Sequence, residues 1–237
     1  MTRRKASNRR ALVTSIAAVA TVIVLCLVVW ANFFWQKPQP QNTPELKSAE
    51  TLTGQMDTFT SAEHSISFTY PGEWTAEEII NKKDTSVYSS TVTVKTANDR
   101  VVAVLSTGGQ LGGACPASAP ELDVSTFDGS KEGMAGLPDQ SGYRYTVVKD
   151  VDGVFRTGYG VTSSPENRSV KLKCPALNVN NEYRVSPNNK KLGTVSFGLL
   201  YSRDRDGYSS LESAEAYMES DEYHVIRDMI TSLSIDS

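Results

Sequence analysis

Residues 11–34 read ALVTSIAAVATVIVLCLVVWANFF and contain no charged side chain. A helix needs about 20 apolar residues to cross the ~30 Å hydrocarbon core of a bilayer, so this stretch is long enough to span one. Residues 1–10 form a tail whose charges are all basic, from Arg3, Arg4, Lys5, Arg9 and Arg10. The sequence therefore predicts a transmembrane helix over residues 11–35 behind a basic tail.

The charges on the two sides of this span predict its orientation. Every charged residue before it is basic, and the first acidic residue of the chain is Glu45. Basic residues are enriched in the cytoplasmic segments of membrane proteins. We therefore expect a single-pass protein of a bacterial plasma membrane, with its N-terminus in the cytoplasm and its C-terminal domain outside.

Two kinds of processing are alternatives to an uncleaved anchor. A signal peptide has an apolar core of roughly 7–15 residues and a cleavage site with small residues, and this span is longer. Aromatic residues occupy the place of such a site, namely Trp30, Phe33, Phe34 and Trp35. A lipoprotein signal has a small residue before its cysteine, whereas Leu25 precedes Cys26. We favour the uncleaved anchor, because its aromatic end fits the membrane interface.

The rest of the chain divides into a linker and one domain. Residues 36–57 are proline-rich and polar, which favours an extended, solvated linker. Residues 58–237 suffice for one domain with its own core. Five of the 24 basic residues precede the span, so the external part carries 19 basic and 27 acidic residues and a net charge of −8. This acidity argues against binding to nucleic acid or to anionic lipid.

The two cysteines of the external domain, Cys115 and Cys174, are predicted to form a disulfide. Cysteine pairs outside the cytoplasm are usually oxidised. A proline follows each of them, so each is expected at the end of an element. A metal site would need further ligands, and the chain has only two histidines.

The segment ISFTYPGEW, residues 66–74, begins the pattern of strands. Its apolar residues alternate with serine and threonine, which is typical of a half-buried strand. Residues 70–73 are predicted to form a type II turn with a positive φ at Gly72, and Trp74 is expected in the core. Residues 75–83 fit either a short helix, by their capping-box spacing, or a second strand.

Turn residues between strand-like runs predict two hairpins, at Asn98-Asp99 and at Asp152-Gly153. The expected strands cover residues 87–94, 101–105, 143–148, 154–161, 170–174 and 195–201. The expected connections are a glycine-rich loop at 108–113, a long surface segment at 116–141 with a short strand near 122–127, and a polar loop at 178–191. Together these runs predict an antiparallel sheet.

The C-terminal tail is predicted to form two helices. Ser209 and Glu212 have capping-box spacing at the start of the first, and the second is expected to begin near Ser220. An apolar stripe at helical spacing follows, formed by Val225, Ile226, Met229, Ile230 and Leu233. An amphipathic helix of this kind packs on a sheet. The predicted class is therefore α+β, with an antiparallel sheet packed by helices that include this C-terminal one.

Two segments together resemble the PsbP-like fold, a group that includes anchored actinobacterial extracytoplasmic proteins. They are ISFTYPGEW at residues 66–74 and MITSLSI at residues 229–235. The resemblance implies an antiparallel sheet sandwiched by helices and no enzymatic activity. It assigns no functional residue to this chain, and the cysteine pair and long loops between the two segments depart from it.

The sequence contains no recognisable catalytic constellation and implies no cofactor. A Ser/His/Asp triad needs a histidine that folding brings to a serine. His64 and His224 are both expected at the surface, and a Gly-x-Ser-x-Gly elbow is absent. No catalytic residue is therefore assigned.

The segment SRDRDG at residues 202–207 resembles the first half of a calcium loop. Asp204 and Asp206 have the spacing of two ligands in such a loop. Its last ligand would be a glutamate, but Ser213 holds that position, and two arginines add positive charge. We interpret the segment as a polar turn in which Asp204 and Asp206 are weak metal candidates.

These observations favour a non-enzymatic binding or scaffolding module that acts with an envelope or membrane partner. The alternatives are a small-molecule or calcium-binding receptor domain and an unrecognised hydrolase. A deep apolar pocket would favour the receptor, and a buried acid with a raised pKa in a cleft would favour the hydrolase. A shallow exposed apolar patch would favour the binding module.

Overall fold

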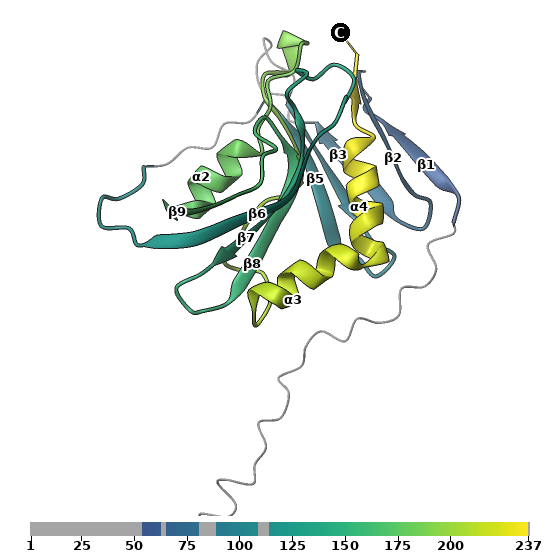
Figure 1. Ribbon diagram of the computed structural model, residues 1–237. Coiled ribbons are helices and arrows are strands. Elements are labelled where there is room, and N and C mark those ends of the chain that lie inside the picture. Colours follow the sequence, from purple (N-terminus) through teal and green to yellow (C-terminus); the bar gives the residue numbers. More distant parts are fainter. Residues whose placement is uncertain (1–53, 63–64, 81–88, 109–113, 237) are drawn as a thin grey trace, which may run out of the picture. The chain divides into compact units, whose positions relative to one another are not determined.

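The computed structural model describes residues 54–62, 65–80, 89–108 and 114–236, which belong to the unit Leu46–Ser237 (Figure 1). The predicted transmembrane helix, the basic tail and most of the linker lie outside the described residues. Within the ranges that are described, none of the helices has the length and apolar character needed to cross a membrane.

The described domain is α+β and its sheets are antiparallel, as predicted. A three-stranded sheet has the order β1-β2-β11, from β1 (Met56–Thr60), β2 (Ile66–Pro71) and β11 (Ser234–Ile235). An eight-stranded sheet has the order β3 (Thr75–Ile80), β4 (Ser90–Lys95), β5 (Val101–Thr107), β10 (Val195–Leu199), β8 (Phe155–Thr162), β7 (Gly142–Lys149), β6 (Glu121–Lys131) and β9 (Arg168–Lys173). Both predicted hairpins are confirmed, and Asp99 and Gly153 supply the positive φ values that their turns use.

Helices cover both faces of the larger sheet (Figure 1). They are α2 (Pro175–Glu182), α3 (Leu211–Ala216) and α4 (Asp221–Thr231), with short 3-10 turns at η1 (Lys190–Leu192) and η2 (Tyr217–Glu219). On one face, Val179 of α2 and Tyr183, which directly follows the helix, pack with Val148 of β7. On the other face, the Tyr145 hydroxyl donates to the Ala214 carbonyl of α3 (3.0 Å). Because side chains alternate along β7, its two faces support two separate cores.

The larger core lies between α4, β2 and the eight-stranded sheet. The predicted stripe of α4 is buried at Ile226, Met229 and Ile230. Phe68 of β2 faces Phe197 of β10, with ring centroids 4.7 Å apart. Burying an apolar side chain of this size contributes about 1.5–3 kcal/mol. The interpretation of the stripe as core is therefore confirmed.

The turn after β2 differs from the predicted one. The Gly72 N–H donates to the Gln55 carbonyl (2.8 Å) and so extends the contact between β1 and β2. The reverse turn comes one residue later than expected, where the Trp74 N–H bonds to the Pro71 carbonyl (2.9 Å). Gly72 is not among the residues with positive φ, so the type II assignment is wrong. Trp74 is buried, as predicted.

Two boundaries near the start of the domain also need correction. Residues 56–57, which the composition assigns to the linker, pair with Tyr70 and Pro71 and belong to β1. The ambiguous segment that begins at Thr75 forms strand β3, which pairs with β4 over its whole length. As an edge strand, β3 pairs every second one of its backbone N–H and C=O groups with β4. These hydrogen bonds outweigh the preference for a helix that the capping-box spacing indicates.

The predicted surface connection at 116–141 contains more strand than expected, and the short strand expected near 122–127 is part of it. It contains β6, the longest described strand, with 11 residues. Pairing with β7 shifts register between Phe127 and Ser130, which is a β-bulge. Asp128 in the bulge has a φ of 45°, and it accepts hydrogen bonds from the Tyr223 hydroxyl (2.6 Å) and from Arg227 Nε (2.9 Å). The irregular strand is thereby tied to α4.

The predicted polar loop at 178–191 is wrong over residues 178–182, which belong to α2. Pro175 stands at the start of this helix, where its missing N–H is not needed. Val179 and Tyr183 are buried against the sheet. Tertiary packing, rather than helix propensity, therefore explains a helix that contains three asparagines.

The C-terminal helices begin close to their predicted positions. Ser210, not Ser209, caps α3, and its partner in the capping box is Ser213. Ser220 caps α4 as expected, through a bond from the Tyr223 N–H. After α4 the chain adds the short strand β11, which the sequence analysis does not predict.

The two segments that resemble the PsbP-like fold are neighbours in space. Ser234 and Ile235 of β11 pair with Ser67 and Ile66 of β2. The second segment therefore closes the small sheet that the first begins. The resemblance itself stays a prediction.

Six tyrosines whose rings contact one another form a cluster under α3 and α4. They are Tyr143, Tyr145, Tyr159, Tyr208, Tyr217 and Tyr223. Tyr143, Tyr145 and Tyr159 are buried in the core and therefore do not line an open groove. Burial raises the pKa of Tyr208 to about 12 and raises the pKa of the other five as well.

We expect this cluster to make the domain unfold cooperatively in alkali. Above pH 10, the ordinary pKa of tyrosine, the unfolded state loses phenol protons that the folded state keeps. The free energy of unfolding therefore falls as pH rises from 10 toward the raised pKa values. In a titration, most of the tyrosinate absorbance should appear only as the near-UV circular dichroism is lost. Full ionisation with an unchanged near-UV spectrum would contradict this assignment.

Candidate functional site

The predicted calcium segment forms an exposed turn between β10 and α3. Asp204 and Asp206 are both exposed, and the Asp204 N–H donates to Ser202 Oγ (3.2 Å). In the ranges that the structure describes, no group of three or more His, Cys, Asp or Glu side chains is placed to hold a metal ion. The weak metal candidates are therefore not brought together with further ligands of these types.

The arginines of this turn bind the strands behind it. Arg203 Nε pairs with Asp150 Oδ2 (3.1 Å), and the same oxygen accepts from the Tyr201 hydroxyl (2.8 Å). Burial and this hydrogen bond raise the pKa of Tyr201 to about 12. Arg156 of β8 donates to Asp152, and these hydrogen bonds lower the pKa of that carboxyl to about 2. The turn and the β7–β8 hairpin are thus held by charged hydrogen bonds.

The predicted cysteine pair is present at disulfide distance. The Cα atoms of Cys115 and Cys174 are 5.8 Å apart, which is ordinary for a disulfide. Cys174 lies between β9 and α2, so its expected place at the end of an element is confirmed. Cys115 lies in the irregular stretch 114–120 before β6, so the same expectation is wrong for it. Of the two histidines, His224 is exposed on α4 as expected, and His64 lies outside the described residues.

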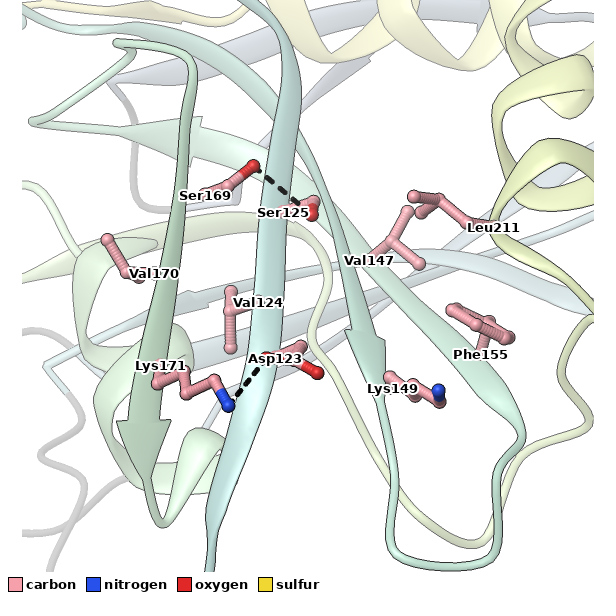
Figure 2. Close-up of a pocket in the computed structure, with 10 residues that line it drawn as sticks. All are labelled: Asp123, Val124, Ser125, Val147, Lys149, Phe155, Ser169, Val170, Lys171 and Leu211. Carbon is pink, nitrogen blue, oxygen red and sulfur yellow. Dashed lines mark hydrogen bonds and ion pairs between the residues drawn. The ribbon is translucent and has the colours of Figure 1, made fainter.

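An open hollow on the α3 side of the larger sheet is a candidate site (Figure 2). We call it the shelf. Its volume is about 530 Å³, and its walls come from β6, β7, β8, β9 and α3. The residues that line it are Asp123, Val124, Ser125, Val147, Lys149, Phe155, Ser169, Val170, Lys171 and Leu211.

Strand register arranges the shelf in two parallel rows. In the first row Lys171, Asp123, Lys149 and Phe155 lie side by side across β9, β6, β7 and β8. In the second row Ser169, Ser125 and Val147 follow in the same order. Residues of one row share a face because antiparallel partners point the same way. The shelf is therefore charged along one row and small or apolar along the other.

The polar groups of the shelf interact with one another only weakly. Lys171 Nζ lies 3.7 Å from Asp123 Oδ1, and both side chains are more than half exposed. Such a surface pair contributes about 0–1 kcal/mol. Ser125 Oγ and Ser169 Oγ are 3.4 Å apart, and Lys149 Nζ lies 5.6 Å from the Phe155 ring centroid. These groups can exchange their present contacts for a ligand at small cost.

The shelf lies next to the part of the sheet that the helices cover. One register step beyond its second row, Tyr145 and Tyr159 are buried beneath α3 and α4. Leu211 at the start of α3 forms the border, and Figure 2 shows it beside Val147. The arrangement can hold a ligand by charge, hydrogen bonds and contact with an apolar wall.

None of the shelf residues was singled out by sequence reasoning. The alternation in RSVKLK, residues 168–173, already separates exposed from partly buried positions. The expected strand near 122–127 covers most of the residues that pair with β9, but no local pattern indicates which strand lies beside it. The missing signal was long-range register, which single-sequence patterns do not contain.

Comparison of the chain with known proteins finds no matching family model, no matching curated protein and no matching solved structure.

Proposed function

We propose that this protein is a membrane-anchored binding module that presents its α+β domain outside the cytoplasm and acts with another protein of the envelope or membrane. The observation that carries the proposal is the shelf. It is an open hollow with exposed charges along one row and an apolar border formed by Phe155 and Leu211. Such a mixture of polar and apolar groups is common in protein interfaces.

The charged row supports recognition rather than structural stabilisation. Lys149 and Lys171 flank Asp123, and all three side chains are exposed. Exposed pairs add little to stability, but they set the orientation and the rate of association with a partner. A linker of about twenty residues would let the domain reach a neighbouring protein in the same membrane.

Crosslinking in the native membrane tests this proposal. Full-length protein with an affinity tag would be crosslinked in its own membrane, captured and analysed by mass spectrometry. We expect one dominant protein partner. Ser125→Arg places a large cation in the shelf and should reduce capture, whereas Thr75→Arg, at an exposed position of the opposite edge strand β3, should not. Equal capture by both variants would contradict the role of the shelf.

A small-molecule receptor is the second candidate, because the volume of the shelf suits a small ligand. About 530 Å³ falls within the ~300–1,000 Å³ typical of such sites. A ligand in the shelf would contact the apolar border and the charged row together. Capture of no specific protein, with a thermal shift by a small polar molecule that Ser125→Arg abolishes, would favour this candidate.

A further inference from the structure

We propose that β9 is a docking edge that binds an extended acidic segment of a protein partner as an additional strand of the eight-stranded sheet. This inference rests on the proposed binding function and names the chemistry of the partner. β9 lies at the end of the sheet, beside the shelf, and it pairs with β6 on one side. A strand edge binds a peptide through main-chain hydrogen bonds, and the alternate side chains give specificity.

The main chain of β9 has donors and acceptors available on its outer side. The Arg168 N–H donates to Thr126 Oγ1 (2.6 Å), so the main chain of Arg168 faces β6. Main-chain groups alternate between the two sides of a strand, so those of Ser169 and Lys171 face outward. Among the described residues, neither has a main-chain partner on that side. The Lys173 carbonyl accepts from Asn178 Nδ2 (2.5 Å), which marks the end of the available edge.

The side chains of β9 predict the pattern of the added strand. Ser169, Lys171 and Lys173 are exposed, and the first two line the shelf. Val170 and Leu172 point to the other face, where they pack partly buried against the core under α2. Residues directly opposite in neighbouring strands share a face. The partner segment should therefore place acidic residues on the shelf side and apolar residues on the α2 side.

Charge favours an acidic partner over a second copy of this chain. The charges of β9 itself are all basic, from Arg168, Lys171 and Lys173. Glu182 already pairs with Arg168, whereas Lys171 is 69% exposed and has only the surface pair with Asp123 (3.7 Å). Two copies of β9 side by side would bring their lysines together, and lysines on an edge strand oppose pairing of that kind. An alternating acidic and apolar segment satisfies the lysines and the apolar face at once.

Binding of defined peptides to the full-length protein in detergent micelles tests the inference. The probe is a fluorescent peptide of alternating glutamate and valine, and the control peptide replaces each glutamate with lysine. We expect saturable binding of the first peptide, measured by fluorescence anisotropy, and at least about tenfold weaker binding of the second. Lys171→Pro removes one outward N–H and one charge, at a position where an edge strand tolerates proline, and should abolish binding.

A charge reversal keeps the test independent of any folding defect in the proline variant. The Lys171→Glu variant should no longer bind the glutamate peptide and should bind the lysine peptide instead. Lys191→Glu, an equally charged change at an exposed position in η1, should bind like the original protein. Unchanged binding in Lys171→Pro and Lys171→Glu would overturn the inference.

Other results separate this inference from the proposed function. A dimer that native mass spectrometry detects and that Lys171→Pro dissociates would make a second copy the occupant and overturn the inference. If Lys171→Pro and Lys171→Glu still capture the crosslinked membrane partner, the inference that β9 is the docking edge is wrong, but the proposed binding function is retained. If the original protein captures no partner, the binding function fails first.

Discussion

Glu182→Ala is expected to lower the free energy of unfolding by about 3 kcal/mol, because it removes the carboxylate that pairs with a fully buried arginine. Arg144 is 0% exposed. Its guanidinium donates to Glu182 (2.5 Å) and to the Ser164 carbonyl (2.7 Å), and it lies 5.2 Å from the Tyr183 ring centroid. Without Glu182, the buried guanidinium of Arg144 keeps only the Ser164 carbonyl and the Tyr183 ring as partners. The expected loss of about 3 kcal/mol is at the lower end of the range for breaking a buried ion pair. The reason is that the Glu182 side chain is 26% exposed, so water can partly replace its carboxylate.

Urea unfolding of the variants would measure this effect. Glu166→Ala removes an exposed acid near the end of β8 and is the matched control, with an expected change below about 0.5 kcal/mol. The double change Arg144→Met with Glu182→Leu should recover much of the loss, since it removes both charges together. A loss below about 1 kcal/mol in Glu182→Ala would mean that the pair behaves like a surface pair.

Replacing Cys115 and Cys174 together is expected to lower the free energy of unfolding by about 4 kcal/mol in the chain-entropy model. Cys115 and Cys174 are 59 residues apart in the sequence, so their bond closes a long loop. That loop contains β6, β7, β8 and β9, which together form half of the larger sheet. The double variant Cys115→Ser with Cys174→Ser avoids a reactive free thiol, and urea unfolding would measure the difference.

The same bond can be checked without mutation. The chain has three cysteines, and the third, Cys26, lies in the predicted membrane span. Mass analysis after thiol labelling under denaturing, non-reducing conditions should therefore find one reactive thiol per chain, at Cys26. Labelling of both Cys115 and Cys174 would contradict the disulfide.

Local patterns were sufficient wherever one face of an element is buried and the other is exposed. The alternation from Ile66 to Tyr70 forms β2, and Ile226, Met229 and Ile230 of the apolar stripe form the buried face of α4. The Asp152-Gly153 pair gave the β7–β8 hairpin, since glycine there adopts a φ of 81°. These features depend on neighbours in the sequence, so the sequence contains their signal.

The errors came where distant contacts decide the structure. The bulge at Asp128 interrupts the alternation of β6, and hydrogen bonds from Tyr223 and Arg227 hold it there. Helix α2 has weak propensity, and burial of Val179 and Tyr183 against β7 favours it instead. In both cases the stabilising partner lies far away in the sequence, so no local pattern could reveal it.

The candidate site depends wholly on such distant contacts. Asp123 and Lys171 meet only because β6 pairs with β9, and Leu211 joins them only when α3 packs on β7. Topology and charge favour the hypothesis of a binding module, but no local pattern predicts where a candidate site lies, since strand order in a sheet is not encoded in any short segment.

Site-specific photocrosslinking of the full-length protein in its native membrane tests the central claim most directly. A photoreactive amino acid would replace Ser125 in the shelf or, as the control, Ile79, which is 65% exposed on the opposite edge strand. The binding-module account predicts one dominant protein adduct from Ser125 and none of that mass from Ile79. The same adduct from both positions, or none from Ser125, would contradict it.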